Sequence, residues 1–238
     1  MLKMYGDLAH WWPLLSPPVD YAEEVAFFLQ VLVDAKIPVF GSMLELGSGG
    51  GNNALHLKNH FSPVTLTDFS EEMLAVSQLL NPDCEHIQGD MRTLRLGRKF
   101  DFVFVHDAID YMTTHADLAS AIKTAAVHCK PNRTALFVPD YVRESFEPAT
   151  EHGGEDGKDR AMRFMEWTYD PDQSDNTYIT EYVYVLREGD EPVRIEHDRH
   201  ICGLFSRADW LGHLRDAGFN ARVLHDPFGR EVFLSVLQ

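Results

Sequence analysis

A run of glycines is the feature of this sequence best suited to binding a ligand. It reads Gly47-Ser-Gly-Gly-Gly51, and the carboxylate of Glu45 stands two residues before it. The run lies between a short apolar segment and a segment with helical spacing. Glycine lets the backbone turn sharply and approach a ligand without an intervening Cβ, and the next helix presents unpaired N–H groups at its start. The pattern predicts a ligand site at Glu45, Gly47, Gly49 and Gly51.

Single carboxylates follow the next apolar segments. Asp68, Asp90 and Asp107 each stand shortly after a short run with strand-like composition. One such acid is usually a solvated loop end or a helix cap. Three of them at successive strand ends fall on the edge of an open sheet where ligands bind. We therefore expect them to surround the same ligand as the glycines.

Three side chains are candidates for acid–base chemistry, namely His106, His200 and Tyr111. Histidine titrates near neutral pH, and His106 stands at the predicted end of a strand, so it is the first candidate for a general base. The alternative is a structural histidine bonded to a helix terminus or a core carbonyl. No HxH or HExxH spacing is present, so we expect no metal site.

The elements that position these residues alternate in type over the first 140 residues. Short segments at 42–46, 64–67, 84–88, 100–105 and 135–138 read as strands, and the segments between them as helices. The strand at 100–105 is apolar almost throughout, which suits a central parallel strand covered on both faces. This alternation predicts a doubly wound, Rossmann-like α/β sheet.

The composition and the pattern of apolar residues change after residue 140. Residues 147–159 are rich in Gly, Glu and Asp and read as a mobile loop. Consecutive strand-like runs at 163–169, 178–186 and 193–205 predict an antiparallel lobe inserted after the fifth strand. The runs at 221–224 and 231–237 predict a closing hairpin, which gives a seven-stranded, mostly parallel sheet with an antiparallel terminal hairpin.

The segment from Glu45 to Gly51 resembles motif I of the class I S-adenosylmethionine-dependent methyltransferases. The resemblance covers residues 40–140 well and 205–238 in outline. It implies that S-adenosylmethionine is the methyl donor, that S-adenosylhomocysteine is the product, and that Asp68 holds both ribose hydroxyls. It places Phe69 and Met73 beside the adenine and assigns Asp90 and Met91 to its edge. His106 falls where the family places groups near the methyl sulfonium.

A closer resemblance is to the amino-sugar N,N-dimethyltransferases of macrolide sugar pathways. It is carried by residues 89–100, by Tyr5 with Tyr21, and by His200 before Leu204-Phe205. It implies that Tyr5 and Tyr21 contact the cofactor and that the lobe contributes to a homodimer. Tyr5, Trp11 and Trp12 either close over the cofactor as a lid or attach the first helix to the core.

The expected organisation is a cofactor-binding domain at 1–140 and 205–238, with a lid and helix at 1–40, and a lobe at 141–204. The net charge of −16 would repel nucleic acid and anionic lipid, and no run reaches the ~20 apolar residues of a membrane span. Three widely spaced cysteines suit a reduced, cytoplasmic setting. We predict methyl transfer to N or O of a small polar metabolite.

Two alternatives remain open at the level of sequence. An NAD-dependent oxidoreductase would also use Asp68, but Asn52 breaks the GxGxxG spacing, and the closing hairpin is not typical of that class. A non-catalytic scaffold that binds S-adenosylhomocysteine would keep the cofactor residues and need no acceptor pocket. The cluster of His106, Asp107, Tyr111 and His200 favours catalysis.

Overall fold

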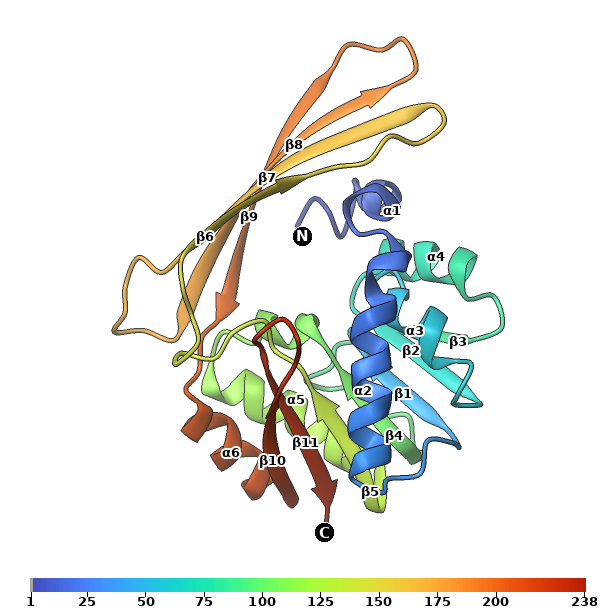
Figure 1. Ribbon diagram of the computed structural model, residues 1–238, viewed down its shortest axis with the longest axis vertical. Helices are drawn as coiled ribbons and strands as arrows, with labels where there is room; N and C mark the ends of the chain where they lie inside the picture. The colour runs from blue at the N-terminus through green and yellow to red at the C-terminus, as the bar shows by residue number, and fades with distance from the viewer. Residues whose placement is uncertain (1) are drawn as a thin grey trace.

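The computed structural model describes residues 2–238, which form a seven-stranded α/β sheet and a separate four-stranded antiparallel sheet (Figure 1). Both were expected, so the predicted fold class is confirmed. Among the described residues, no helix combines the length and the apolar character needed to cross a membrane.

The large sheet has the strand order β10-β11-β5-β4-β1-β2-β3. The first five strands along the chain are parallel, and β11 runs antiparallel to β5. The strands are β1 (Met43–Leu46), β2 (Val64–Asp68), β3 (Glu85–Gln88), β4 (Phe100–Val105), β5 (Cys129–Phe137), β10 (Phe219–His225) and β11 (Glu231–Leu237). The centre of the sheet is buried on both faces, and this accounts for its continuous apolar runs.

Helices cover both faces of this sheet. Residues of α2 and α3 share one hydrophobic cluster with one face, and residues of α5 and α6 share a second cluster with the other. The helices are α1 (Trp12–Leu15), α2 (Ala22–Asp34), α3 (Asn52–Leu57), α4 (Glu71–Leu80), α5 (His115–His128) and α6 (Arg207–Asp216), with 3-10 turns η1 (Ala9–Trp11), η2 (Pro18–Tyr21) and η3 (Asp107–Tyr111). Side-chain caps from Ser70, Thr114 and Ser206 set the starts of α4, α5 and α6.

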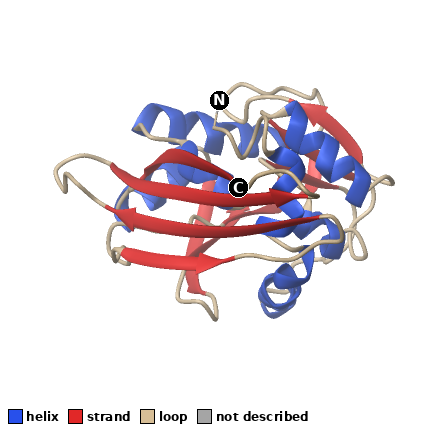
Figure 2. Cartoon of the chain, turned by 90° about the horizontal axis from the view of Figure 1, so that it is seen from above, coloured by secondary structure: helices blue, strands red, loops and turns tan. Residues whose placement is uncertain are grey.

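The antiparallel lobe has the strand order β6-β7-β8-β9 and lies between β5 and α6 in the sequence. Its strands are β6 (Ala149–Gly153), β7 (Arg160–Tyr169), β8 (Thr177–Glu188) and β9 (Arg194–Gly203). In the view from above, the long strands of this lobe run side by side across the width of the molecule (Figure 2). The prediction of one mobile loop at 147–159 is wrong, because 149–153 pair with β7 as an edge strand. Its polar composition carries no apolar alternation from which a strand could be predicted.

The N-terminal segment joins the two sheets. Met4, Leu8 and Trp11 pack in one buried cluster with Met162 and Tyr184 of the lobe. The segment therefore lies between the lobe and the ends of the parallel strands (Figure 1). The predicted domain boundaries at 140/141 and 204/205 stay a prediction.

Candidate active site

A cavity of about 660 Å³ lies at the carboxyl ends of the parallel strands. Residues from the ends of β1, β2, β4 and β5 line one side of it, and the N-terminal segment and the lobe line the other. This is the edge of an open α/β sheet at which ligands bind.

The glycine turn after β1 requires glycine for steric reasons. Gly47 and Gly49 line the cavity and have positive φ angles of 74° and 52°. A Cβ on Gly47 would lie 2.3 Å from the Cβ of Ala108 and 2.7 Å from the Cε of Met91. The indole of Trp12 lies over Gly50, where a Cβ would be 2.3 Å from its Cδ1. The N-terminal segment therefore packs directly on the turn.

Asp68 ties this turn to the end of β2. Its Oδ2 accepts a hydrogen bond from the N–H of Gly49 at 2.8 Å, and its Oδ1 accepts one from the N–H of Ser70 at 2.8 Å. Burial raises the pKa of the Asp68 carboxyl, and the backbone N–H donors oppose that shift. Each oxygen keeps lone-pair capacity for a ligand, because a carboxylate offers about four acceptor sites.

Glu45 is a buried carboxylate in the middle of β1. Its side chain lines the cavity, the residue is 2% exposed, and its Oε2 has no hydrogen-bond partner. Burial raises its pKa to about 8. A cation in the cavity would relieve the cost of this desolvated carboxyl.

Apolar side chains line the cavity next to Asp68. Met73 and Met91 are buried, whereas Phe69 is 62% exposed. Two of the predicted ligand residues do not line the cavity. The first is Asp90, whose two carboxylate oxygens accept hydrogen bonds from the Arg92 guanidinium, which lowers the pKa of the carboxyl. The second is Gly51, where an added Cβ would meet the side chain of Ser77 rather than the cavity.

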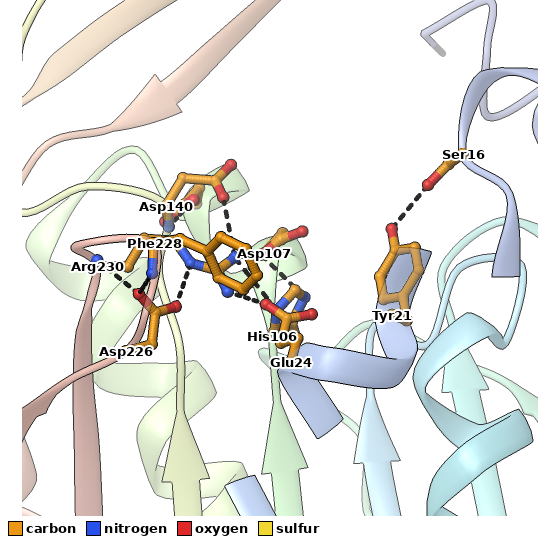
Figure 3. Close-up of polar contacts among 10 residues, drawn as sticks. Ser16, Tyr21, Glu24, His106, Asp107, Asp140, Asp226, Phe228 and Arg230 are labelled. Carbon is orange, nitrogen blue, oxygen red and sulfur yellow. Dashed lines mark hydrogen bonds and ion pairs between the residues drawn. The ribbon is translucent and has the colours of Figure 1, made fainter. Parts of the chain in front are cut away.

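His106 is held between two carboxylates where β4 ends (Figure 3). Its Nε2 lies 2.9 Å from Glu24 Oε1, and its Nδ1 lies 2.8 Å from Asp107 Oδ1. Burial opposes protonation, but the charge and hydrogen bond of Asp107 outweigh it, and the pKa of His106 is raised to about 9. An imidazolium at neutral pH has no free lone pair, so the geometry does not favour His106 as a general base.

Arg230 completes this network from the loop between β10 and β11. Its guanidinium pairs with Glu24, and its Nε donates to Asp226 Oδ2 at 2.7 Å. The terminal nitrogen Nη1 lies 3.6 Å from Asp107 Oδ1 and 3.9 Å from Asp140 Oδ1 (Figure 3). Neither Glu24 nor Arg230 was expected from the sequence.

The other two predicted catalytic residues, Tyr111 and His200, are in contact with each other in the cavity lining. The Tyr111 hydroxyl donates to the Tyr5 hydroxyl at 2.9 Å and lies 2.7 Å from His200 Nδ1. His200 Nε2 in turn lies 3.4 Å from Asp198 Oδ2, whose oxygen also accepts the N–H of Met4 at 3.1 Å. The chain thus gathers its N-terminus, η3 and β9 around one polar cluster.

Comparison with known proteins agrees with this geometry. Residues 43–132 match the family described as a methyltransferase domain. The chain is an S-adenosylmethionine-dependent methyltransferase. The match covers the glycine turn, Asp68 and His106, and it gives no support to the oxidoreductase or scaffold alternatives.

The similarity to known proteins extends over nearly the whole length of this methyltransferase. A dTDP-3-amino-3,4,6-trideoxy-alpha-D-glucopyranose N,N-dimethyltransferase of Streptomyces venezuelae is 28% identical over 91% of each chain. A dTDP-3-amino-3,6-dideoxy-alpha-D-glucopyranose N,N-dimethyltransferase of Streptomyces fradiae is also 28% identical, over 96% of this chain and 90% of the relative. The solved structure of DesVI from Streptomyces venezuelae is similar with a TM-score of 0.83 and 26% identity over 92% of each chain.

Several lining residues of the methyltransferase were missed as site residues in the sequence. They are Asp140 after β5, Glu151 and Glu166 on the lobe, and Tyr182 and Tyr184 on β8. Alternate residues of a strand share a face, so the tyrosines at 178, 182 and 184 could have been assigned to one surface. The sequence alone could not show that this surface faces the cavity, because that depends on how the lobe packs against the N-terminal segment.

Proposed function

We propose that the methyltransferase acts on the nitrogen of an amino group carried by a small sugar. The observation that carries this proposal is that one cavity runs from the glycine turn to carboxylates of the lobe, so donor and acceptor can meet inside it. Three similar proteins are described as N,N-dimethyltransferases of amino sugars, which supports nitrogen as the acceptor and two methyl groups as the outcome.

The residues on the glycine side fit the donor. Asp68 would accept both ribose hydroxyls, and Phe69, Met73 and Met91 would contact the adenine. Glu45 would pair with the ammonium of the methionine part, because its Oε2 is buried and unpartnered. Tyr21 would border the donor, held by a 2.7 Å hydrogen bond between its hydroxyl and Ser16 Oγ. Bound there, S-adenosylmethionine supplies an electrophilic methyl group.

The chain contributes mainly alignment and exclusion of water. Trp12 covers the glycine turn and Tyr5 packs against Trp12. Holding two reactants at the right distance supplies much of the rate of a displacement. We assign His106 a positioning role, since its ion pairs with Glu24 and Asp107 fix the loop that carries Asp110 and Tyr111. His200 and Tyr111 remain candidates for contact with the acceptor, with Tyr5 as the third member of their cluster.

The outer face of the lobe supports a homodimer. Apolar side chains on that face are exposed, among them Met165, Trp167, Ile195 and Ile201. Exposed patches of this kind often mark protein interfaces. We also propose that residues 141–204 form a separate lobe, that the acceptor is a small molecule, and that the enzyme works in the cytoplasm.

A pair of sugars that differ only in one substituent tests the proposed acceptor atom. The enzyme is incubated with S-adenosylmethionine and either a 3-amino-3,6-dideoxy sugar or its 3-hydroxy counterpart, and the products are analysed by mass spectrometry. We expect up to two methyl groups on the amino sugar and none on the hydroxy sugar. Methylation of the hydroxy sugar alone would contradict the proposal.

A further inference from the structure

The part of the cavity bordered by η3, by the residues after β5 and by the lobe is acidic. Five carboxylates line it, and we call them the acceptor chamber: Asp107, Asp110, Asp140, Glu151 and Glu166. Among residues 2–238, no lysine or arginine lines the cavity. Acidic side chains therefore outnumber basic ones in this lining, where His106 is already paired with Asp107.

These carboxylates are placed where they repel one another. Glu151 and Glu166 stand directly opposite on β6 and β7, a position at which like charges are destabilising. Asp110 accepts the N–H of Asp140 at 2.8 Å, which brings these two residues together. Burial and the neighbouring acids raise the pKa of Asp110, Asp140 and Glu166. A cation in the chamber would relieve this repulsion.

A second feature of the chamber points to a polar ligand. The hydroxyl of Tyr184 has no hydrogen-bond partner, although the residue is fully buried and lines the cavity. A buried hydroxyl without a hydrogen-bond partner destabilises the folded chain. A ligand with hydroxyl or amino groups beside β8 would satisfy it.

The nearby arginines are already paired. Arg230 contacts Glu24 and Asp226, with Asp107 and Asp140 within 3.9 Å of its Nη1. Arg143 donates to backbone carbonyls of residues 173, 175 and 204. A diphosphate entering the chamber would face carboxylates without an unpaired guanidinium to bind it.

We propose that the acceptor is a polyhydroxylated amine without a phosphate group, which binds as its ammonium ion to the acceptor chamber and Tyr184. It gives a proton to a chamber carboxylate, and the neutral nitrogen then forms the C–N bond as the C–S bond of the donor breaks and S-adenosylhomocysteine leaves. This inference rests on the proposed function and narrows it. It separates the present enzyme from its relatives, whose described substrates are dTDP-linked amino sugars.

Two substrates with the same amino sugar test the proposal. One is dTDP-3-amino-3,6-dideoxyglucose, and the other is the methyl glycoside of that sugar, which has no phosphate. We expect kcat/KM for the methyl glycoside to be at least about tenfold higher, because like charges brought together in a site cost several kcal/mol. Lowering the charge of the chamber with the double variant D140N/E166Q should reduce this preference about fivefold or more.

The controls separate charge from folding. Glu191, exposed in the turn between β8 and β9, serves as the matched control, and E191Q should keep the wild-type preference. Should D140N/E166Q lose S-adenosylhomocysteine binding through misfolding, E151Q on the exposed edge strand replaces it. Preference for the dTDP-linked sugar overturns the proposal and leaves the proposed function intact, whereas methylation of neither sugar overturns both.

Discussion

At the scale of single residues, the site is marked by carboxylates in unusual environments. Glu45 is buried without a partner for one oxygen, and Asp68 is bonded by backbone N–H groups on both oxygens. Their types and spacing were visible in the sequence, and both line the cavity. Asp90 had the same kind of sequence signal, but its neighbour Arg92 occupies its carboxylate.

Asp68 and Asp90 form a matched pair for testing the donor site. Asp68→Asn should weaken S-adenosylhomocysteine binding at least about tenfold, because charge-assisted hydrogen bonds to ribose are worth roughly 1.5–3 kcal/mol each. Asp90→Asn should change the affinity much less. Titration calorimetry measures both. Equal losses in the two variants would refute the separate roles, and a thermal melt of each variant checks folding.

His106 predicts a specific pH dependence of stability. Its pKa is about 9 in the folded chain and 6.5 in the reference state. The stability it contributes is therefore fully present below pH 6.5 and is lost as the pH rises through about 9, by at most roughly 3 kcal/mol. The pKa of Glu45 is likewise raised, from 4.5 to about 8. Its contribution to the stability of the fold is therefore also lost as the pH rises, between pH 4.5 and about pH 8.

Urea unfolding of the wild type and of His106→Gln isolates the histidine, since Glu45 is present in both. The wild type should lose more free energy of unfolding than the variant between pH 6.5 and pH 9.5. The same loss in both proteins would mean that His106 is not charged at neutral pH.

At the scale of elements, the central parallel strands β1, β2 and β4 were predictable because they are buried and rich in apolar residues. The edge strand β6 was not, since its residues at 149–153 are polar and its hydrogen bonds come from β7 alone. The sequence pattern thus predicts a strand well where burial requires apolar residues, and it missed β6, whose polar residues are held in the sheet by pairing with β7.

The glycine turn gives a prediction at this scale. Gly47→Ala should destabilise the fold and abolish cofactor binding, because it adds both a strained backbone, at roughly 1–2 kcal/mol, and a Cβ 2.3 Å from Ala108. Gly97→Ala is the control, since φ there is 67° but nothing lies within 4 Å of the added Cβ. Chemical denaturation should show a clearly larger loss for Gly47→Ala, and equal losses would place the whole cost in the backbone.

At the scale of the whole molecule, the site depends on contacts between distant parts of the chain. Glu24, His106 and Arg230 come from α2, the end of β4 and the last hairpin, and the Tyr5 hydroxyl meets Tyr111. No local periodicity encodes these pairings. The sequence therefore predicted the lining residues around the glycine turn, which one βαβ unit positions, better than the lining residues that the lobe contributes.

The outer face of the lobe gives a prediction for the assembly. If that face forms the homodimer, Trp167→Glu with Ile201→Glu should convert the protein to a monomer in light scattering coupled to size exclusion. Val19→Glu, an exposed apolar position far from the lobe in sequence, should leave the mass unchanged. A wild-type protein that is monomeric at all accessible concentrations would rule the dimer out.

The central claim is that donor and acceptor amine meet in one cavity between the glycine turn and the lobe. Its most direct test is the mass of a 3-amino-3,6-dideoxy sugar after incubation with S-adenosylmethionine that carries a deuterated methyl group. We expect deuterated methyl groups on the amino nitrogen with the wild type, and at most a small amount of that product with Asp68→Asn at the same donor concentration. Undiminished methylation by that variant, or no labelled amine with the wild type across a panel of amino sugars, would contradict it.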